Sequence, residues 1–151
     1  MSHIEQIPLE LTWPIRQQVM YPGQSLEKVK LKDDPEGIHF GLFDNNQLIS
    51  VCSWFKKDKK AQFRKFATLT QFQGSGYGTQ LLKYIIQFSI RESVDILWCN
   101  ARISAIEFYK KLGFTETQTR FKKNGHEFVI MQLVLEPGSQ SENHAAFINK
   151  K

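Results

Sequence analysis

The feature that most constrains this chain is the stretch QFQGSGYGTQLL, residues 71–82, in which three glycines alternate with other residues before an apolar run. A glycine inside a helix or strand costs roughly 0.5–1 kcal/mol relative to alanine, so three together predict backbone that must bend or be approached closely. The apolar residues after the glycines recur at helical spacing, and the AQFRKFATL segment before them is typical of a strand. The sequence therefore predicts strand, glycine-rich turn and helix over residues 61–91.

A glycine-rich turn at the start of a helix is a candidate anion site. The first amide groups of a helix lack acceptors within it and the dipole is positive there, while glycines allow successive amides to point at a phosphate. Two known phosphate loops do not fit: no lysine stands where GxxxxGK[ST] requires it, and Thr79 occupies the place of the last residue of GxGxxG. The pattern that fits is QxxGxG, from Gln73 to Gly78. A glycine-rich turn that binds nothing stays as the alternative.

The order of elements predicts a mixed sheet. We expect a strand over residues 3–7, a helix from Thr12 that ends before Pro22-Gly23, a hairpin that turns at residues 44–47, and a further strand at 61–69. The glycine turn and its helix follow. A strand–helix–strand connection of this kind is parallel and right-handed, whereas hairpins are antiparallel.

The second half of the chain completes the pattern. DILWCNA is a short apolar run, which favours a strand buried on both sides. SAIEFYKKLGF predicts a helix with a capping box at Ser104 and Glu107 and a stop at Gly113. Asn124-Gly125 predicts a last hairpin. The predicted class is α/β with mostly antiparallel strands, a central parallel pair and helices on both faces, in one domain over residues 1–135. We expect the polar residues 136–151 to be a loose tail.

Composition narrows the compartment and the partners. The chain has 151 residues, of which 41% are apolar and 23% charged, as in an ordinary globular protein. Its two cysteines are far apart and without metal-ligand spacing, no export signal begins the chain, and no apolar run approaches 18 residues. We therefore expect a cytoplasmic protein with no metal and no membrane contact. The net charge of +5 is concentrated partly in a lysine loop at 56–60, which we expect to be solvated rather than a specific nucleic-acid site.

Two stretches together carry a family resemblance, FATLTQFQGSGYGTQLL at 66–82 and NARISAIEFYKKLGF at 100–114. They resemble the cofactor-binding strand, loop and helix, and the later AxxFYxxxGF helix, of the GNAT superfamily of acyl-CoA-dependent N-acyltransferases. The resemblance extends over the predicted elements from residue 3 to 135. It implies a GNAT-like fold whose parallel pair splays to admit acyl-CoA. It also implies that acetyl-CoA (CoA after transfer) donates an acetyl group to a primary amine by direct attack.

The same resemblance assigns the cofactor-binding residues. The main chain of Phe66, Ala67 and Thr68 is expected beside the pantetheine arm. The loop is expected to wrap the pyrophosphate through its backbone amides, with the residues Gln73, Gly74, Ser75, Gly76, Tyr77, Gly78 and Thr79. Arg102 stands where relatives often have an asparagine, and it could hold the cofactor's phosphates or face the acceptor.

The reaction needs a general acid for the departing thiolate, and Tyr109 matches the family's acid. A phenol, with a reference pKa of about 10, is protonated at neutral pH and can give its proton to a thiolate whose reference value is about 8.5. Without the resemblance, Tyr109 would be a packing aromatic beside Phe108. A backbone amide near Thr68 is the candidate for stabilising the oxyanion.

The general base is less defined. Many relatives carry an acidic residue on the cofactor strand, whereas this chain has Arg64 and Lys65 there. Three candidates are left: a water chain on main-chain carbonyls, Asn100 holding such a water, and His126 beside the last hairpin turn. Asn100 can equally be a strand-end turn residue, and a lone histidine at a hairpin is often merely exposed.

The acceptor amine is open between a small molecule and a protein. A guanidinium prefers carboxylate or phosphate, so Arg64 and Arg102 would favour an acceptor that carries an acidic group, unless both simply face solvent. We interpret the acidic KDDPEG segment, residues 32–37, as a solvated loop. The last hairpin or the tail could supply a homodimer contact. The competing functions are a CoA sensor or partner-binding module with little catalysis, and a basic nucleic-acid binder.

Overall fold

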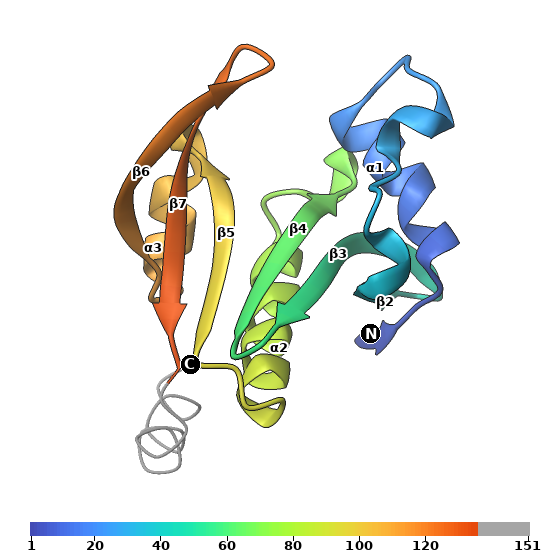
Figure 1. The fold of residues 1–151 in the computed structure, drawn as a ribbon. Helices are drawn as coiled ribbons and strands as arrows, with labels where there is room; N and C mark the ends of the chain where they lie inside the picture. The colour runs from blue at the N-terminus through green and yellow to red at the C-terminus, as the bar shows by residue number, and fades with distance from the viewer. Residues whose placement is uncertain (136–151) are drawn as a thin grey trace. The chain divides into compact units, whose positions relative to one another are not determined.

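The computed structural model describes residues 1–135, and the expected loose tail at 136–151 lies outside the described residues. Its helices and strands (Figure 1) are β1 (Ser2–Gln6), α1 (Thr12–Met20), β2 (Ile38–Asp44), β3 (Gln47–Lys57), β4 (Lys60–Thr68), α2 (Tyr77–Arg91), β5 (Ile96–Arg102), α3 (Ile106–Lys111), β6 (Thr115–Lys123) and β7 (His126–Val134). Short 3₁₀ turns connect several of them, including two between α1 and β2.

The strands form one mixed sheet in the order β1-β2-β3-β4-β5-β7-β6. β4 and β5 pair in parallel over Lys60–Gln62 and Ile96–Trp98, while β1–β2, β2–β3, β5–β7 and β6–β7 pair antiparallel. The predicted α/β class, with a mostly antiparallel sheet and a central parallel pair, is confirmed.

The chain divides into two compact units. Unit 1 is Met1–Phe55 with Phe63–Ile85, and unit 2, within the described residues, is Lys56–Gln62 with residues 86–135. Strand β4 and helix α2 each contribute residues to both units. A single domain over residues 1–135 stays a prediction.

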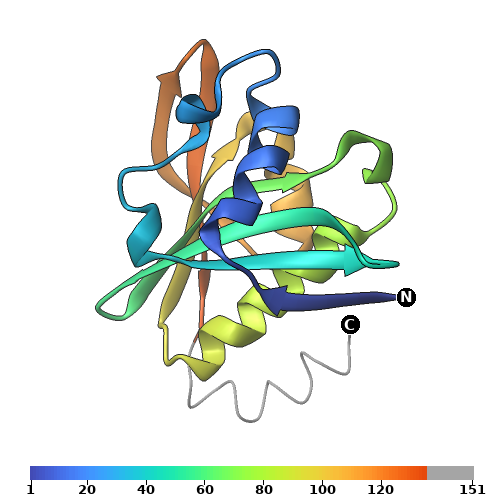
Figure 2. The ribbon, with the colours of Figure 1, turned by 90° about the vertical axis from the view of Figure 1, so that its right-hand side faces the viewer.

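In unit 1, helices cover both faces of the β2–β3 hairpin. Side chains alternate across a strand, so neighbours on β2 face different helices. The ring of Phe40 meets Tyr84 of α2 edge to face, with centroids 5.7 Å apart. The next residue back, His39, joins a polar network with α1, which crosses β2 and β3 in Figure 2. In unit 2, α3 lies against β6 (Figure 1).

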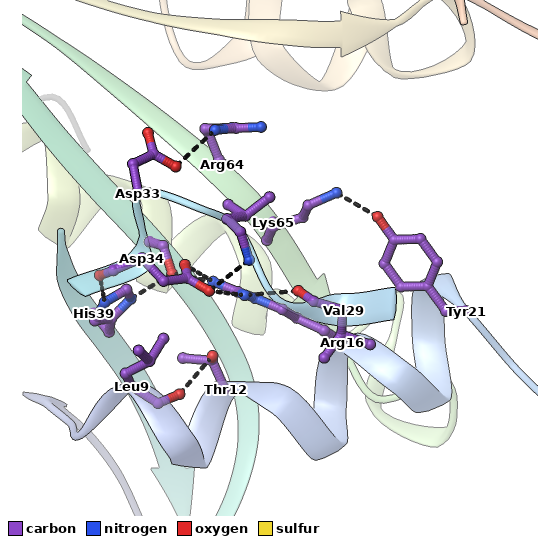
Figure 3. A network of polar contacts seen from close by, with 12 residues as sticks. Leu9, Thr12, Arg16, Tyr21, Val29, Asp33, Asp34, His39, Arg64 and Lys65 are labelled. Atoms are coloured by element: carbon purple, nitrogen blue, oxygen red, sulfur yellow. Dashed lines mark hydrogen bonds and ion pairs between the residues drawn. The ribbon is translucent and has the colours of Figure 1, made fainter. Parts of the chain in front are cut away.

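A buried arginine fixes α1 to the strands and to the segment that follows it (Figure 3). Arg16 is fully buried, and its two terminal nitrogens hold both carboxylate oxygens of Asp34 at 2.8 and 2.9 Å. The same nitrogens also donate to the carbonyl of Val29 and to Ser53 Oγ, each at 2.9 Å. Because every atom of the pair but Arg16 Nε has a partner, the two charges can be buried together.

His39 extends this network. Its Nδ1 lies 2.6 Å from Ser53 Oγ and its Nε2 lies 2.9 Å from the carbonyl oxygen of Asp34. Since a carbonyl only accepts, Nε2 carries the proton and Nδ1 accepts from Ser53. Burial lowers the pKa of His39, which keeps the ring neutral. Burial raises the pKa of the Asp34 carboxyl, but hydrogen bonds from Arg16 and from the Leu31 amide outweigh it, so the pKa lies below its usual range. Ser53 and His39 resemble a nucleophile and its base, yet both side chains are buried away from any substrate.

This network corrects the interpretation of KDDPEG as a solvated loop. Asp34 is 1% exposed and paired with Arg16, whereas Asp33 beside it is half exposed. The segment forms a 3₁₀ turn over Asp34–Glu36, which turns one carboxylate inward and leaves its neighbour outside.

Two further expectations are wrong. β5 is not buried on both sides: Leu97, Cys99 and Ala101 are buried, while the residues between them are partly or fully exposed. The capping box at Ser104 is absent, because a 3₁₀ turn over Ile103–Ala105 precedes α3 and Ala105 caps the helix without a side-chain hydrogen bond.

The turns follow the sequence signals closely. Asn45 and Asn46, and again Asn124 and Gly125, have positive φ at both central positions, as a two-residue hairpin turn requires. Gly113 ends α3 with φ of +98°. The lysine loop is shorter than expected, because β3 continues to Lys57 and β4 begins at Lys60.

Arg16→Met should destabilise the chain by about 3–5 kcal/mol, because it leaves the Asp34 carboxylate buried without its counter-ion. The matched control is Arg64→Met, whose ion pair with Asp33 is partly exposed and should contribute less than about 1 kcal/mol. Urea unfolding at neutral pH measures both. Equal losses in the two variants would contradict the role given to the buried pair.

Candidate functional site

The glycine-rich loop of unit 1 joins the end of β4 to the start of α2. A short 3₁₀ turn over Thr70–Phe72 leads into it, and residues 73–76 are exposed. Gln80 donates its amide to the carbonyl of Gly76 at 3.0 Å, which closes the first turn of α2 and makes Gly76 its N-cap. The sequence thus placed the glycine turn and the helix start correctly.

The three glycines are required for two different reasons. Gly74 and Gly76 have φ of +80° and +88°, and a Cβ at either position would meet nothing within 4 Å. Their backbone conformation, not their space, therefore favours glycine. Gly78 is the opposite case, because a Cβ there would lie 3.0 Å from Cζ of Phe66 and 3.7 Å from Thr68 Oγ1. Gly78 lets the first turn of α2 approach the side chains of β4.

Four successive amides are left for a ligand at this helix start. They belong to Gly76, Tyr77, Gly78 and Thr79, which are the N-cap and the first three helical residues. Within residues 1–135 none of these N–H groups has a hydrogen-bond acceptor. Unpaired amides and the positive end of a 15-residue helix make this helix start a candidate anion site.

Side chains hold the loop and the end of β4 in place. Gln73 donates from Nε2 to the carbonyl of Thr68 at 2.9 Å. Ser50 of β3 lies 3.2 Å from the carbonyl oxygen of Ala67 and 2.8 Å from Thr68 Oγ1. Gln73, the first residue of the QxxGxG pattern, is therefore a brace for the loop.

Tyr77 is the second brace. Its hydroxyl donates to Asp44 Oδ2 at 2.5 Å, and its ring meets Phe72 edge to face at 6.0 Å. The hydrogen bond from Tyr77, with a further one from the Met1 ammonium, lowers the pKa of Asp44, and the same bond raises the pKa of the Tyr77 hydroxyl. The side chain of Tyr77 is thus committed to Asp44, and its backbone amide is the group left for an anion.

The two cations on β4 also have partners in unit 1 (Figure 3). Arg64 Nη1 lies 3.3 Å from Asp33 Oδ1, and the guanidinium lies 6.0 Å from the Phe55 ring centre. Lys65 has φ of +54° inside the strand, and its ammonium donates to the hydroxyl of Tyr21. The Arg64 side chain is 29% exposed, so it is intermediate between a solvated and a buried arginine.

The remaining predicted residues lie in unit 2. Tyr109 is 8% exposed, with Phe108 and Phe114 edge to face against its ring at 5.2 and 5.8 Å. Asn100 and Arg102 are exposed on β5, opposite Ile130 and Phe128 of β7. His126 is exposed at the start of β7, paired with Lys123. The structure thus brings the predicted loop residues together, whereas those of unit 2 come from three separate elements.

Two classes of site have no support in the described part of the chain. Residues 1–135 contain no cluster of three or more histidine, cysteine or acidic side chains that could hold a metal ion. No helix within that range is long and apolar enough to cross a membrane. Burial raises the pKa of the Cys99 thiol, which makes it a poor nucleophile and metal ligand.

Comparison with known families shows to which family this chain belongs. The model of the acetyltransferase (GNAT) domain matches residues 15–135. The chain belongs to the GNAT acetyltransferase family. Its GNAT relatives include YitI of Bacillus subtilis, named an uncharacterized N-acetyltransferase, which is 32% identical over 77% of this chain and 84% of its own. The [ribosomal protein bS18]-alanine N-acetyltransferase of Haemophilus influenzae is 31% identical, and the match covers 79% of this chain and 83% of the relative's own length.

Solved GNAT structures share the fold. The Escherichia coli ribosomal-protein-S18-alanine N-acetyltransferase has a TM-score of 0.77 at 21% identity, covering 90% of this chain and 95% of that one. A GNAT acetyltransferase from Elizabethkingia anophelis with acetyl-CoA bound has a TM-score of 0.69 at 17% identity, covering 89% and 98%. The family uses acetyl-CoA, and this chain is a GNAT N-acetyltransferase.

Asp44 and Ser50 are the site residues that sequence reasoning missed. In the sequence, Asp44 is part of the predicted hairpin turn DNNQ, and Ser50 is one polar residue in an apolar strand. Asp44 contacts Tyr77, 33 positions further on, and Ser50 contacts Thr68, 18 positions further on, and nothing in the spacing of these residues predicts either contact. Only the packing of the β2–β3 hairpin beside β4 and the loop brings them there.

Gly78→Ala should be rescued by Phe66→Leu, because the added methyl would press on the Phe66 ring. We expect the loss of stability from Gly78→Ala to fall by about 1 kcal/mol in the Phe66→Leu background. The control is Gly76→Ala, which should cost about 1–2 kcal/mol from its positive φ whether or not Phe66 is changed. Urea unfolding of the parent, the three single variants and the two double variants with Phe66→Leu measures this. Equal coupling at both glycines would contradict the two reasons given for them.

Proposed function

We propose that this chain transfers the acetyl group of acetyl-CoA to a primary amine, with the loop of unit 1 as the site of the donor's pyrophosphate. The observation that supports this most is the run of four amides without acceptors at the start of α2, preceded by glycines of positive φ. Such amides suit a doubly charged, multi-oxygen group such as a pyrophosphate. The exposed position of residues 73–76 leaves the group room to enter.

We propose that residues from Gln73 to Thr79 bind the pyrophosphate through their backbone, while Phe66, Ala67 and Thr68 run beside the pantetheine arm. The carbonyls of Ala67 and Thr68 already accept from Ser50 and Gln73. A carbonyl oxygen has two lone pairs, so each can still accept from an amide of the arm.

Acetyl-CoA supplies a thioester carbonyl that a neutral amine can attack. In our proposal the amide near Thr68 stabilises the negative charge that develops on the carbonyl oxygen, and Tyr109 gives its proton to the departing sulfur. Phe108 and Phe114 pack against the Tyr109 ring, which would fix the direction of its hydroxyl. Asn100 and His126 are the side chains available as the base or its water holder. Both are exposed, as proton exchange with solvent requires.

The acceptor that we propose carries an acidic group near its amine. Arg64 supports this, because Asp33 and Phe55 fix the position of its guanidinium while 29% of its side-chain surface stays accessible to a ligand. Arg102 is an exposed second candidate, either for this group or for a phosphate of the donor. The bS18-alanine relative makes a protein amine a reasonable class beside small molecules. A cytoplasmic location and a homodimer contact through the last hairpin stay predictions.

Tyr109→Phe should lower kcat by about 10²- to 10⁴-fold, since it removes the proposed acid and keeps the ring that Phe108 and Phe114 contact. Thiol release from acetyl-CoA, assayed with a panel of amines with and without a carboxylate, measures this. The comparison variant is Phe108→Leu, which keeps the hydroxyl and loosens the packing that directs it, so it should lower kcat by less than Tyr109→Phe does.

Release of thiol by the parent chain must depend on an added amine. CoA binding without turnover across the whole panel would favour the sensor alternative instead. An unchanged kcat in Tyr109→Phe would remove Tyr109 from the mechanism and leave the enzyme assignment standing.

A further inference from the structure

The loop between β4 and α2 has two side-chain anchors, one at each end. Gln73 ties the front of the loop to the carbonyl of Thr68, and Tyr77 ties the back of it to Asp44. Between them stand Gly74, Ser75 and Gly76, which have no long side chain to fix them. Glycine has the greatest backbone freedom of any residue, so the conformation of this segment depends on the anchors.

Asp44 is itself well placed as an anchor. It is the last residue of β2, and the tight turn at Asn45 and Asn46 joins it directly to β3. Its Oδ2 accepts from Tyr77 at 2.5 Å, and its side chain is only 21% exposed. The carboxylate therefore connects the least constrained part of the loop to a strand of the sheet.

The charge of Asp44 makes its position informative. A carboxylate close to an anion-binding loop repels the anion, so by charge alone it weakens binding. A hydrogen bond that holds Tyr77 has the opposite effect, because amides that already point the right way lose less entropy when the anion binds. The two effects predict opposite signs for Asp44→Ala, which removes both the charge and the acceptor of the Tyr77 hydroxyl.

We propose that Asp44 and Tyr77 are positioning residues that fix the amides of Gly76–Thr79 for the donor's pyrophosphate. This inference rests on the proposed function, and it gives Tyr77 a role through its side chain in addition to its backbone amide. Neither side chain needs to touch the donor. The contact lies wholly within unit 1, as do the amides that it positions.

Calorimetric titration of the full chain with CoA tests the inference. Asp44→Ala and Tyr77→Phe should each weaken CoA binding by about three- to tenfold, and the double variant should be no weaker than the singles by more than about twofold, since both break the hydrogen bond between Tyr77 and Asp44. The matched controls are Asp33→Ala and Tyr21→Phe, which remove a carboxylate and a hydrogen-bonded hydroxyl outside the loop in the same unit. Both should bind CoA as the parent does.

A second measurement keeps the inference testable apart from the proposed function. Backbone order parameters of Gly76 and Gly78 in the ligand-free chain should fall in Tyr77→Phe and not in Tyr21→Phe. CoA binding that is unchanged or tighter in both Asp44→Ala and Tyr77→Phe would overturn the inference. If the parent does not bind CoA, the proposed function fails. Unchanged order parameters of the two glycines in Tyr77→Phe would overturn the inference whether or not the parent binds CoA.

Discussion

The first turn of α2 cannot pair its own amides, and the surrounding parts of unit 1 are arranged around that constraint. Gly74 and Gly76 take the positive φ that brings the chain into the helix, and Gly78 lets the turn approach Phe66. Gln73 and Tyr77 anchor the two ends of the loop. The glycines, which weaken a helix or strand elsewhere, are here the condition for leaving backbone donors open to an anion.

A second constraint, the buried ion pair of Arg16 and Asp34, fixes the segment between α1 and β2. Burying two charges costs free energy that hydrogen bonds must offset. Besides the two bonds within the pair, the partners are the Val29 carbonyl, Ser53 Oγ and the Leu31 amide. The segment held in this way carries Tyr21 and Asp33 to Lys65 and Arg64 on β4 (Figure 3). These contacts give each of the two cations on β4 a partner from that segment.

Local signals in the sequence predicted the local structure well. Asn124-Gly125 predicted its hairpin because few residues tolerate two successive positive φ values, and Gly113 predicted the end of α3 for the same reason. The loop was predictable because QxxGxG combines three glycines with a following apolar helix. The predicted capping box at Ser104 is wrong because a 3₁₀ turn occupies the place where the helix was expected to start. A four-residue pattern does not contain the tertiary contacts that decide between the two.

Contacts between distant residues could not be predicted. Arg16 and Asp34 are 18 positions apart, and Asp44 and Tyr77 are 33 apart. Each pair depends on how strands and helices pack, while each residue taken alone reads as an ordinary surface charge or turn residue. β5 shows the same limit, since its apolar run indicated burial on two sides, whereas its side chains alternate between buried and exposed.

We propose that the amides at the start of α2 bind the pyrophosphate of the donor. Amide chemical shifts of the isotope-labelled chain, titrated in parallel with CoA and with pantetheine, test this most directly, because only CoA carries the pyrophosphate. We expect CoA to shift the amide signals of Gly76, Tyr77, Gly78 and Thr79 most strongly and pantetheine to leave them unshifted. Large shifts elsewhere with these four amides unmoved by CoA, or equal shifts with both ligands, would contradict it.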